Sequence, residues 1–291
     1  MTQVSVIIPA HGRARFVARA IASARRQTLA CEIVLVDDGS NPPLSIQLPR
    51  EVLENVRLVV NPGNLNAAYS RNRGVAATTS PILAFLDSDD EWSPHHLENA
   101  LDTCRFDDRQ LYVTPLRPGT AGFITNAYAY LFGRDGDFRS SGLICARETF
   151  AAINGFDTQL NKHQDWDFVL RASERCRLYV GDMPTMHLDL TAPDRMSSCA
   201  DLEASRRFFE RHRIHMSRAH HTVFWSDIIK FCMVIGDLNN LRLCKQLARP
   251  YIKISDLDPI TRLCWFSPRL SNRMYRLRCA IRSRYNQVEA L

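Results

Sequence analysis

The sequence predicts an α/β fold with a mostly parallel sheet flanked by helices, followed by a helical C-terminal extension. Short apolar, β-branched runs recur at residues 4–8, 32–36, 58–60 and 82–86. Helix-like segments alternate with them, and this alternation is typical of parallel strands joined by helices. Beyond residue 200 the chain becomes basic, and its apolar residues recur at helical spacing, which predicts the extension.

A local feature of the sequence predicts each element of the sheet region. The first strand, Val4–Ile8, ends at Pro9, and apolar residues recur at helical spacing between it and the second strand, Glu32–Val36. A third strand is expected at Leu58–Val60, and the small-residue-rich segment Ala67–Ala77 is expected to form the next helix. Ligands of such sheets bind beyond the carboxyl ends of the strands, so the residues that follow the strands are candidates for a site.

A group of carboxylates follows the fourth strand. The apolar run Ile82–Leu86 is followed by Asp87, Asp89 and Asp90. Carboxylates this close repel one another, and a hard cation such as Mg²⁺ or Mn²⁺ prefers oxygen ligands and bridges carboxylates to phosphates. The pattern therefore indicates a metal-assisted phosphate site or, with equal weight, an alternative without a ligand. The alternative is a polar loop in which Asp90 caps a helix at Glu91–Trp92.

A second acidic strand end favours the site over the loop. The second strand is followed by Asp37 and Asp38. In a parallel sheet, Pro9, Asp38 and the 87–90 group are expected along one rim, where an acid can accept hydrogen bonds from a ribose hydroxyl or a base N–H.

Six short motifs occur in order along the chain, at residues 4–9, 36–40, 61–64 with 70–74, 86–90, 141–157 and 164–167. The series resembles family 2 glycosyltransferases of the GT-A, Rossmann-like fold, and the resemblance covers about residues 3–200. It implies a hexosyltransferase-type enzyme that moves a sugar from a nucleotide sugar to an acceptor hydroxyl, with inversion at the anomeric carbon. The usual cofactor is Mn²⁺ or Mg²⁺.

The resemblance implies a donor site. Pro9 and Asp38 line the nucleoside pocket, Arg71 approaches the nucleotide or its diphosphate, Asp87 lies near the ribose, and Gly142 lies on a strand beside the donor and acceptor sugars. Because Asp38 suits an N–H of uracil, UDP is the expected nucleotide, while dTDP offers the same edge and GDP stays open.

The resemblance also implies a metal ligand, Asp89, and a second ligand, His187, which follows the expected base by about twenty residues. Imidazole suits Mn²⁺ better than Mg²⁺. The alternative for His187 is an ordinary surface or hydrogen-bonded residue.

The catalytic base implied by the resemblance is Asp165, the second acid of the family's Glu-Asp pair. The first position is Gln164 here, which removes a charge that could tune the pKa of Asp165. The alternative for Asp165 is a helix N-cap, with Asp167 and Arg171 forming an exposed pair one turn apart.

Length and composition indicate a catalytic domain at 1–200 and a basic helical region at 201–291. An apolar fraction of 45% is ample for a core, and no apolar run reaches eighteen residues. The nine cysteines are scattered without a Cys-x-x-Cys pair, which indicates reduced thiols in a cytoplasmic protein. The first strand begins by residue 4, which leaves no room for a signal peptide.

The extension is the basic part of the chain. Residues 201–291 hold 17 Lys+Arg and 8 Asp+Glu, a net charge of +9, so the +6 of the whole chain leaves −3 for residues 1–200. Helices are expected at Leu202–Arg213, Phe224–Gly236 and Leu238–Ala248, and from Ser267 onward.

The helix expected from Ser267 carries an apolar stripe surrounded by arginines. Such a helix is typical of an anionic membrane surface and would suit a peripheral enzyme of the inner leaflet whose acceptor is a saccharide or a lipid-linked saccharide. The alternative is that the stripe packs on the catalytic domain or on a second subunit.

Other function classes fit less well. A haloacid-dehalogenase-type phosphatase places its Asp-x-Asp near the N-terminus, and a nucleotidyltransferase needs a richer Gly-Arg-Lys loop than residues 10–13. No nucleic-acid-binding module is recognised. A non-catalytic scaffold that docks on a membrane glycan-assembly partner stays open as the alternative function.

Overall fold

The computed structural model describes residues 3–106, 109–119, 121–133, 136–189 and 201–267. The chain divides into two compact units, residues 1–193 and 194–291. The first holds the sheet and the second is helical.

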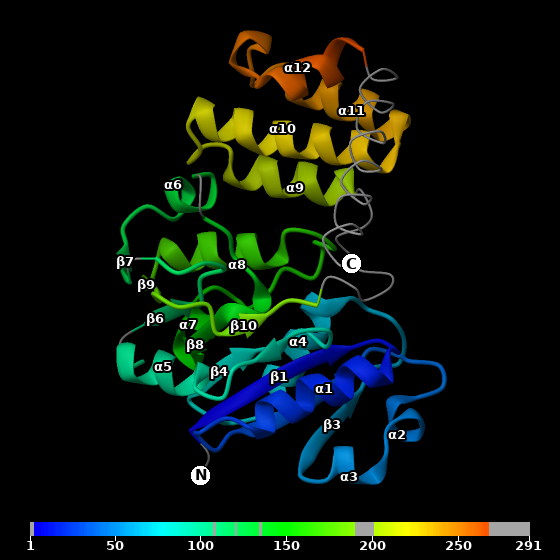
Figure 1. Cartoon of the computed structure of the whole chain (residues 1–291), viewed down its shortest axis with the longest axis vertical. Coiled ribbons are helices and arrows are strands. Elements are labelled where there is room, and N and C mark those ends of the chain that lie inside the picture. The colour runs from blue at the N-terminus through cyan, green and yellow to red at the C-terminus, as the bar shows by residue number, and fades with distance from the viewer. Residues whose placement is uncertain (1–2, 107–108, 120, 134–135, 190–200, 268–291) are drawn as a thin grey trace, which may run out of the picture. The chain divides into compact units, whose positions relative to one another are not determined.

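The first unit is built on an eight-stranded sheet with the order β3-β2-β1-β4-β8-β6-β9-β7. Strands β7 and β8 run opposite to the others, so the sheet is mixed and mostly parallel. The predicted fold class is thereby confirmed (Figure 1). The strands are β1 Val4–Ala10, β2 Glu32–Asp37, β3 Val56–Val60, β4 Ile82–Phe85, β6 Gln110–Val113, β7 Gly122–Ile124, β8 Leu143–Ala146 and β9 Arg177–Val180.

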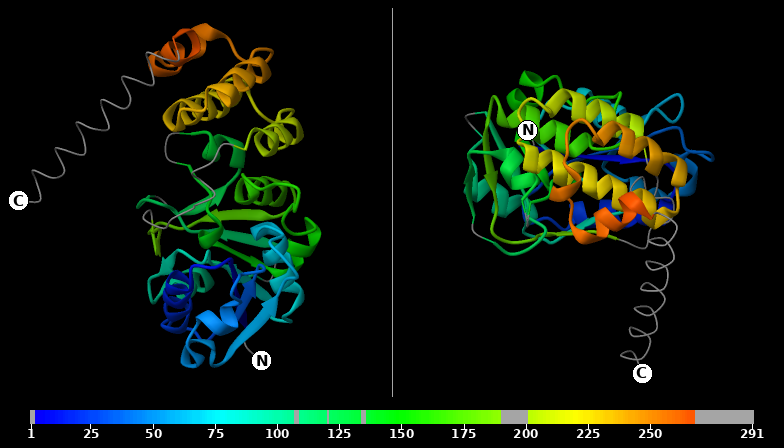
Figure 2. Two further views of the ribbon diagram at one scale, coloured as in Figure 1. Left: turned by 90° about the vertical axis from the view of Figure 1, so that its right-hand side faces the viewer. Right: turned by 90° about the horizontal axis from the view of Figure 1, so that it is seen from above.

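Helices lie on both sides of this sheet, as the left view of Figure 2 shows. They are α1 Ala14–Arg25, α2 Leu44–Gln47, α3 Arg50–Leu53, α4 Ala67–Ala76, α5 His96–Thr103, α6 Ala127–Leu131, α7 Arg147–Ala152 and α8 Gln164–Ser173, with the 3₁₀ turn η1 at Ser140–Gly142.

Strand β1 is buried on both faces, which explains its continuous apolar run. Side chains alternate along a strand, so Val6 and Ile8 join the core that includes Val17 of α1. Ile7 points the other way, toward α4. A Cβ at Gly74 of α4 would lie 2.4 Å from Cγ2 of Ile7, so only glycine allows α4 to pack this closely on the sheet.

A two-stranded antiparallel sheet, β5 Glu91–Trp92 with β10 Met186–His187, follows the acidic turn. The alternative with a helix at Glu91–Trp92 is wrong, because this segment pairs with β10. Helix α5 begins at His96, four residues beyond β5.

The second unit contains α9 Leu202–His212, α10 Arg218–Ile235, α11 Leu238–Ala248, η3 Ile254–Asp256 and α12 Pro259–Phe266. The predicted α9 and α11 are confirmed to within a residue. Helix α10 begins six residues before the predicted start because Ser217 and His220 form a capping box. Gly236, with φ 77°, ends it at the predicted break.

The second unit packs around aromatic side chains. Phe209 lies with its ring centroid 5.5 Å from Phe224, 5.0 Å from Trp225 and 4.7 Å from Tyr251. The ring centroid of Phe208 also lies 5.5 Å from that of Phe224. This unit therefore has its own core.

The basic helix expected from Ser267 falls on residues 268–291, outside the described residues. Among the residues that the structure describes, no helix has the length and apolarity needed to span a membrane. The seven cysteines in the described ranges are all free thiols, as expected.

Candidate functional site

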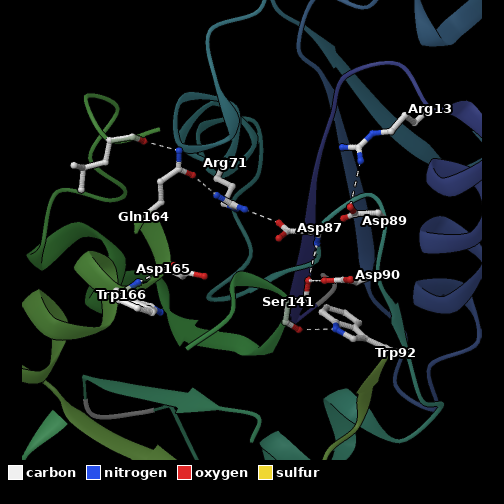
Figure 3. Close-up of polar contacts among 11 residues, drawn as sticks. Arg13, Arg71, Asp87, Asp89, Asp90, Trp92, Ser141, Gln164, Asp165 and Trp166 are labelled. Carbon is white, nitrogen blue, oxygen red and sulfur yellow. Dashed lines mark hydrogen bonds and ion pairs between the residues drawn. The ribbon is translucent and has the colours of Figure 1, made fainter. Parts of the chain in front are cut away.

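The site begins where β4 ends. The amide of Leu86 still donates to the carbonyl of Ile7 at 3.0 Å, which continues the pairing of β4 with β1. The chain then turns sharply, with the amide of Asp90 donating to the carbonyl of Asp87 at 3.1 Å. The turn brings Asp87, Asp89 and Asp90 together beyond the sheet edge, as expected (Figure 3).

Ser141 of η1 stabilises this turn by hydrogen bonds. Its hydroxyl accepts from the amide of Asp87 at 3.0 Å and donates to Oδ2 of Asp90 at 2.5 Å. Its carbonyl accepts from Nε1 of Trp92 at 2.7 Å. Burial, together with the neighbouring Asp87, raises the pKa of Asp90 above its usual range. Asp90 is therefore an internal anchor of the turn.

Arg71 of α4 joins the acidic turn to α8. Its Nη2 donates to Oδ1 of Asp87 at 2.5 Å and its Nη1 donates to Oε1 of Gln164 at 2.8 Å. The guanidinium lies 5.0 Å from the ring centroid of Phe156, and the side chain is only 2% exposed. Arg71 is thus held by Asp87 and Gln164, as Figure 3 shows, and by the ring of Phe156.

Arg13 pairs with the second acid of the turn. It follows β1, immediately before α1, and its Nη1 lies 3.3 Å from Oδ2 of Asp89. Both side chains are partly exposed, Arg13 by 28% and Asp89 by 15%. The acidic turn thus meets an arginine on each side.

Asp38 is buried and organises the loop before α4. Oδ1 accepts from Nδ2 of Asn61 at 2.7 Å and from the amide of Leu65 at 3.0 Å, and Oδ2 accepts from the amide of Asn66 at 3.0 Å. Asn66 in turn caps α4, which carries Arg71. Three of about four acceptor positions of this carboxylate are therefore used by the protein.

Pro9 lies near the end of β1, whereas Gly142, which was expected on a strand, ends the 3₁₀ turn η1. Pro9 lies in β1 opposite Val36, and both Pro9 and Gly142 are buried. The carbonyl of Gly142 accepts from the amide of Thr114 at 2.9 Å, which places it just before β8. Both therefore belong to the framework around the site.

Asp165 is the second residue of α8. The N-cap position belongs to His163, so the alternative that Asp165 is the N-cap is wrong. The ring of Phe168, one turn later, lies 4.3 Å from that of Phe156 and 6.0 Å from that of Phe85 at the end of β4. This aromatic packing fixes the start of α8 beside the acidic turn.

The carboxylate of Asp165 is held loosely. Its Oδ1 accepts from the amide of Trp166 at 3.0 Å. Burial raises the pKa of Asp165 to about 6, opposed by Arg139 and assisted by Asp137. A carboxylate with this pKa is deprotonated at neutral pH and is a stronger base than an ordinary aspartate.

The segment before η1 approaches Asp165 from another side. Arg139 donates through Nε to Oδ2 of Asp137 at 2.8 Å, and Asp137 Oδ1 accepts from Nε1 of Trp166 at 3.2 Å.

Asp167 pairs with Arg171 at 2.7 Å as expected, but the acid is fully buried rather than exposed.

His187 lies on β10, opposite Glu91 of β5. Its Nε2 is 3.0 Å from the hydroxyl of Ser93, and the residue is exposed. No group of three or more His, Cys, Asp and Glu side chains within the described ranges is arranged to hold a metal. The pairing of His187 with Asp89 at one ion stays a prediction.

The acidic turn nevertheless fits a divalent cation in one respect. Asp87 and Asp89 supply hard oxygen donors at one short turn. Mg²⁺ is commonly bound by one or two carboxylates with substrate phosphates completing the shell. These residues fit that mode and not a cage made of protein ligands alone.

The structure thus brings together Asp87, Arg71, Gln164 and the start of α8, while Pro9 and His187 make none of these contacts. Sequence reasoning gave no role to Arg13, Ser141, Asp137 or Arg139. Ser141 carried a signal, since it begins one of the motifs. The others lie in segments without a motif.

Comparisons with known proteins point to one family. A family model described as "Glycosyl transferase family 2" matches residues 5–158. Amylovoran biosynthesis glycosyltransferase AmsB of Erwinia amylovora is 30% identical over 197 residues, 58% of this chain and 64% of that protein. Succinoglycan biosynthesis protein ExoW of Rhizobium meliloti is 31% identical over 140 residues, 46% of this chain and 42% of that protein. The chain therefore spans less than two thirds of these two relatives.

Among solved structures, S. aureus TarS 1–349 in complex with UDP-GlcNAc is similar with a TM-score of 0.64 at 16% identity. The match covers 99% of this chain and 92% of that one. At this identity the likeness concerns the fold.

Proposed function

The chain belongs to glycosyl transferase family 2, and we propose that it moves a sugar from a nucleotide-diphosphate sugar to a hydroxyl of a saccharide or a lipid-linked saccharide, with inversion. One observation carries the proposal. Arg71 links Asp87, at the edge where a donor would bind, to Gln164, the neighbour of Asp165. The buried positive charge of Arg71 is thus held by the residue that directly precedes Asp165, whose carboxylate has a raised pKa.

Asp165 serves this reaction as the general base. An acceptor hydroxyl attacks best while its proton passes to a positioned carboxylate. The raised pKa of about 6 keeps Asp165 deprotonated at neutral pH and strengthens it as a proton acceptor. The attacking oxygen then forms the new glycosidic bond on the face opposite the leaving diphosphate.

The leaving diphosphate gains negative charge as the old bond breaks. Arg71 is buried and fixed, so its charge is already in place and needs little reorganisation during the reaction. Mn²⁺ or Mg²⁺ bound at Asp89 would supply Lewis-acid stabilisation of the same charge. His187 is a further ligand in this proposal if it leaves Ser93.

The donor is proposed to be a UDP-sugar. The similar TarS structure was solved in complex with UDP-GlcNAc, which supports this choice. One acceptor position of the Asp38 carboxylate is left for a base N–H after its three internal hydrogen bonds.

The setting is proposed to be polysaccharide or glycolipid synthesis on the cytoplasmic face of a membrane. AmsB and ExoW are named for amylovoran and succinoglycan biosynthesis, which supports a polysaccharide. The membrane part rests on the basic sequence of residues 268–291. Deleting these residues should weaken binding to anionic vesicles in a salt-dependent way, and equal binding by the shortened chain would remove this part of the proposal.

The first test is calorimetric titration with UDP, dTDP, GDP and CDP, each with and without Mn²⁺. Cation-dependent binding of one nucleotide supports the transferase and directs the donor search to its sugars. If a folded sample binds none of them, the alternative is favoured: a scaffold of the same fold that docks on a membrane partner. The paired carboxylates at the sheet edge favour the enzyme, because a scaffold has no need of them.

A further inference from the structure

Arg13 occupies a place at the acidic turn that no motif accounts for. It lies at the junction of β1 and α1 with φ 53°, directly after Gly12 with φ 61°. Left-handed backbone is uncommon for residues other than glycine. From this position the guanidinium reaches across 76 residues of sequence to Asp89, the residue proposed to hold a divalent cation.

The contact between Arg13 and Asp89 is loose in comparison with its neighbour. The Nη1–Oδ2 distance is 3.3 Å, and the side chains are 28% and 15% exposed. Strong charge-assisted hydrogen bonds are shorter, about 2.7–2.9 Å. Arg71, by contrast, is 2% exposed and lies 2.5 Å from Asp87, which is itself 34% exposed, and Arg71 also donates to Gln164. The Arg13 pair is therefore the longer of the two, and its arginine is the more exposed.

Charge explains why such a pair belongs here. Asp87, Asp89 and Asp90 place three carboxylates in four residues, and Arg71 faces only the first of them. An arginine at Asp89 reduces the repulsion within the turn. A divalent cation at Asp89 would do the same and more strongly, but it would repel a guanidinium at that oxygen.

We propose that Arg13 and a divalent cation are alternative partners of Asp89, so that a cation binds there only as the Arg13–Asp89 pair opens. Arg13 is thus a positioning residue that keeps the turn in charge balance before the cation arrives and limits the affinity for free cation. The inference rests on the proposed function for its cation, and it adds a competitor from the chain itself.

The test measures binding of Mn²⁺ alone, without nucleotide, by calorimetry or by the paramagnetic resonance signal of free Mn²⁺. Arg13→Gln should bind Mn²⁺ about three- to tenfold more tightly than the wild type, since a competing partly buried charge is removed. Arg13→Lys keeps the charge and should stay close to the wild type. Thermal unfolding of each variant checks that it is folded.

Two controls make the result specific. Arg15 is exposed, two residues along the chain, and Arg15→Gln removes the same charge where solvent and salt screen it, so no gain is expected. The double variant Arg13→Gln with Asp89→Asn should lose the gain, because the shared partner is missing.

An unchanged or weaker Mn²⁺ affinity in folded Arg13→Gln overturns the inference, and so does a gain that persists in the double variant. Because the assay contains no nucleotide, it is independent of sugar transfer. If the wild type neither binds nucleotide nor transfers sugar while Arg13→Gln gains Mn²⁺ affinity, the proposed function fails and the exchange at Asp89 stands.

Discussion

The two halves of the candidate site are held in different ways. At the acidic turn, Asp87 meets Arg71 at 2.5 Å and Asp89 meets Arg13 at 3.3 Å. At the start of α8, the Asp165 carboxylate accepts one hydrogen bond from within the described part of the chain, from the adjacent amide at 3.0 Å. The first half sets negative charge against arginine charge, which is fixed at Arg71, and the second leaves a carboxylate with a raised pKa.

Because of this difference, the two halves of the site suit two different tasks at one edge of the sheet. Stabilising a leaving diphosphate needs charges that do not move. Accepting a proton needs a carboxylate that is not neutralised by a close cation, because such a cation lowers its basicity. Gln164 contributes to this division, since it engages Arg71 without adding a charge beside Asp165.

The largest expected effect comes from removing the base. Asp165→Asn should lower sugar transfer by about 10²–10⁴-fold, the usual contribution of a general base, and should leave nucleotide binding unchanged. Product formation and calorimetric titration measure the two quantities separately. Asp102→Asn, at an exposed position of α5, is the matched control. Near wild-type transfer by Asp165→Asn would refute the assignment.

Removing Arg71 should affect both halves at once. Arg71→Met keeps much of the volume but leaves Asp87 and Gln164 without their partner, and we expect a loss of about 2–4 kcal/mol in the free energy of unfolding. Nucleotide affinity should fall with it. Denaturant unfolding, compared with Arg73→Met on the same helix, measures the effect. Equal losses in the two variants would contradict a special role for Arg71.

The pH dependence of sugar transfer and of nucleotide binding distinguishes the two halves of the site without a mutation. The pKa of Asp165 is about 6, so transfer should fall tenfold per pH unit below about 6 as the base becomes protonated. Nucleotide affinity should not fall over the same pH range. Activity measured from pH 5 to 8 at saturating donor tests this, and a limb near pH 4 would mean that the base is an ordinary carboxylate.

The smallest expected effect is on stability. Since folding raises the pKa of Asp165 from 3.8 to about 6, its contribution to stability is fully present below about pH 4 and is lost as pH rises through 6. Asp165→Asn should therefore be more stable than the wild type at pH 7.5, by about 1–2 kcal/mol after allowing for partial solvation.

Thermal unfolding of the wild type and Asp165→Asn at pH 4 and at pH 7.5 measures this difference in stability. The two proteins should unfold alike at pH 4. A variant that is less stable at pH 7.5 would show that the carboxylate is stabilised, not strained, in the folded chain.

The sequence by itself determined the first four strands and the acids that follow two of them. Apolar runs such as 4–8 and 82–86 predict buried strands, because parallel strands bury both faces. Acids that directly follow such strands are therefore expected at the sheet edge. Helices α9 and α11 of the second unit follow from helical spacing. Where a polar pair sets a boundary, as Ser217 and His220 do for α10, apolar spacing alone misplaced the start.

The tertiary structure alone decided the partners of those acids. Arg13 and Asp89 are 76 residues apart, and Arg71 and Gln164 are 93 apart. Such pairs depend on which strands are neighbours and on how α4 and α8 pack on them, through contacts such as Gly74 on Ile7. The pattern of residue types along the chain is local, whereas an ion pair depends on distance in space, and only the folded sheet brings these side chains within reach.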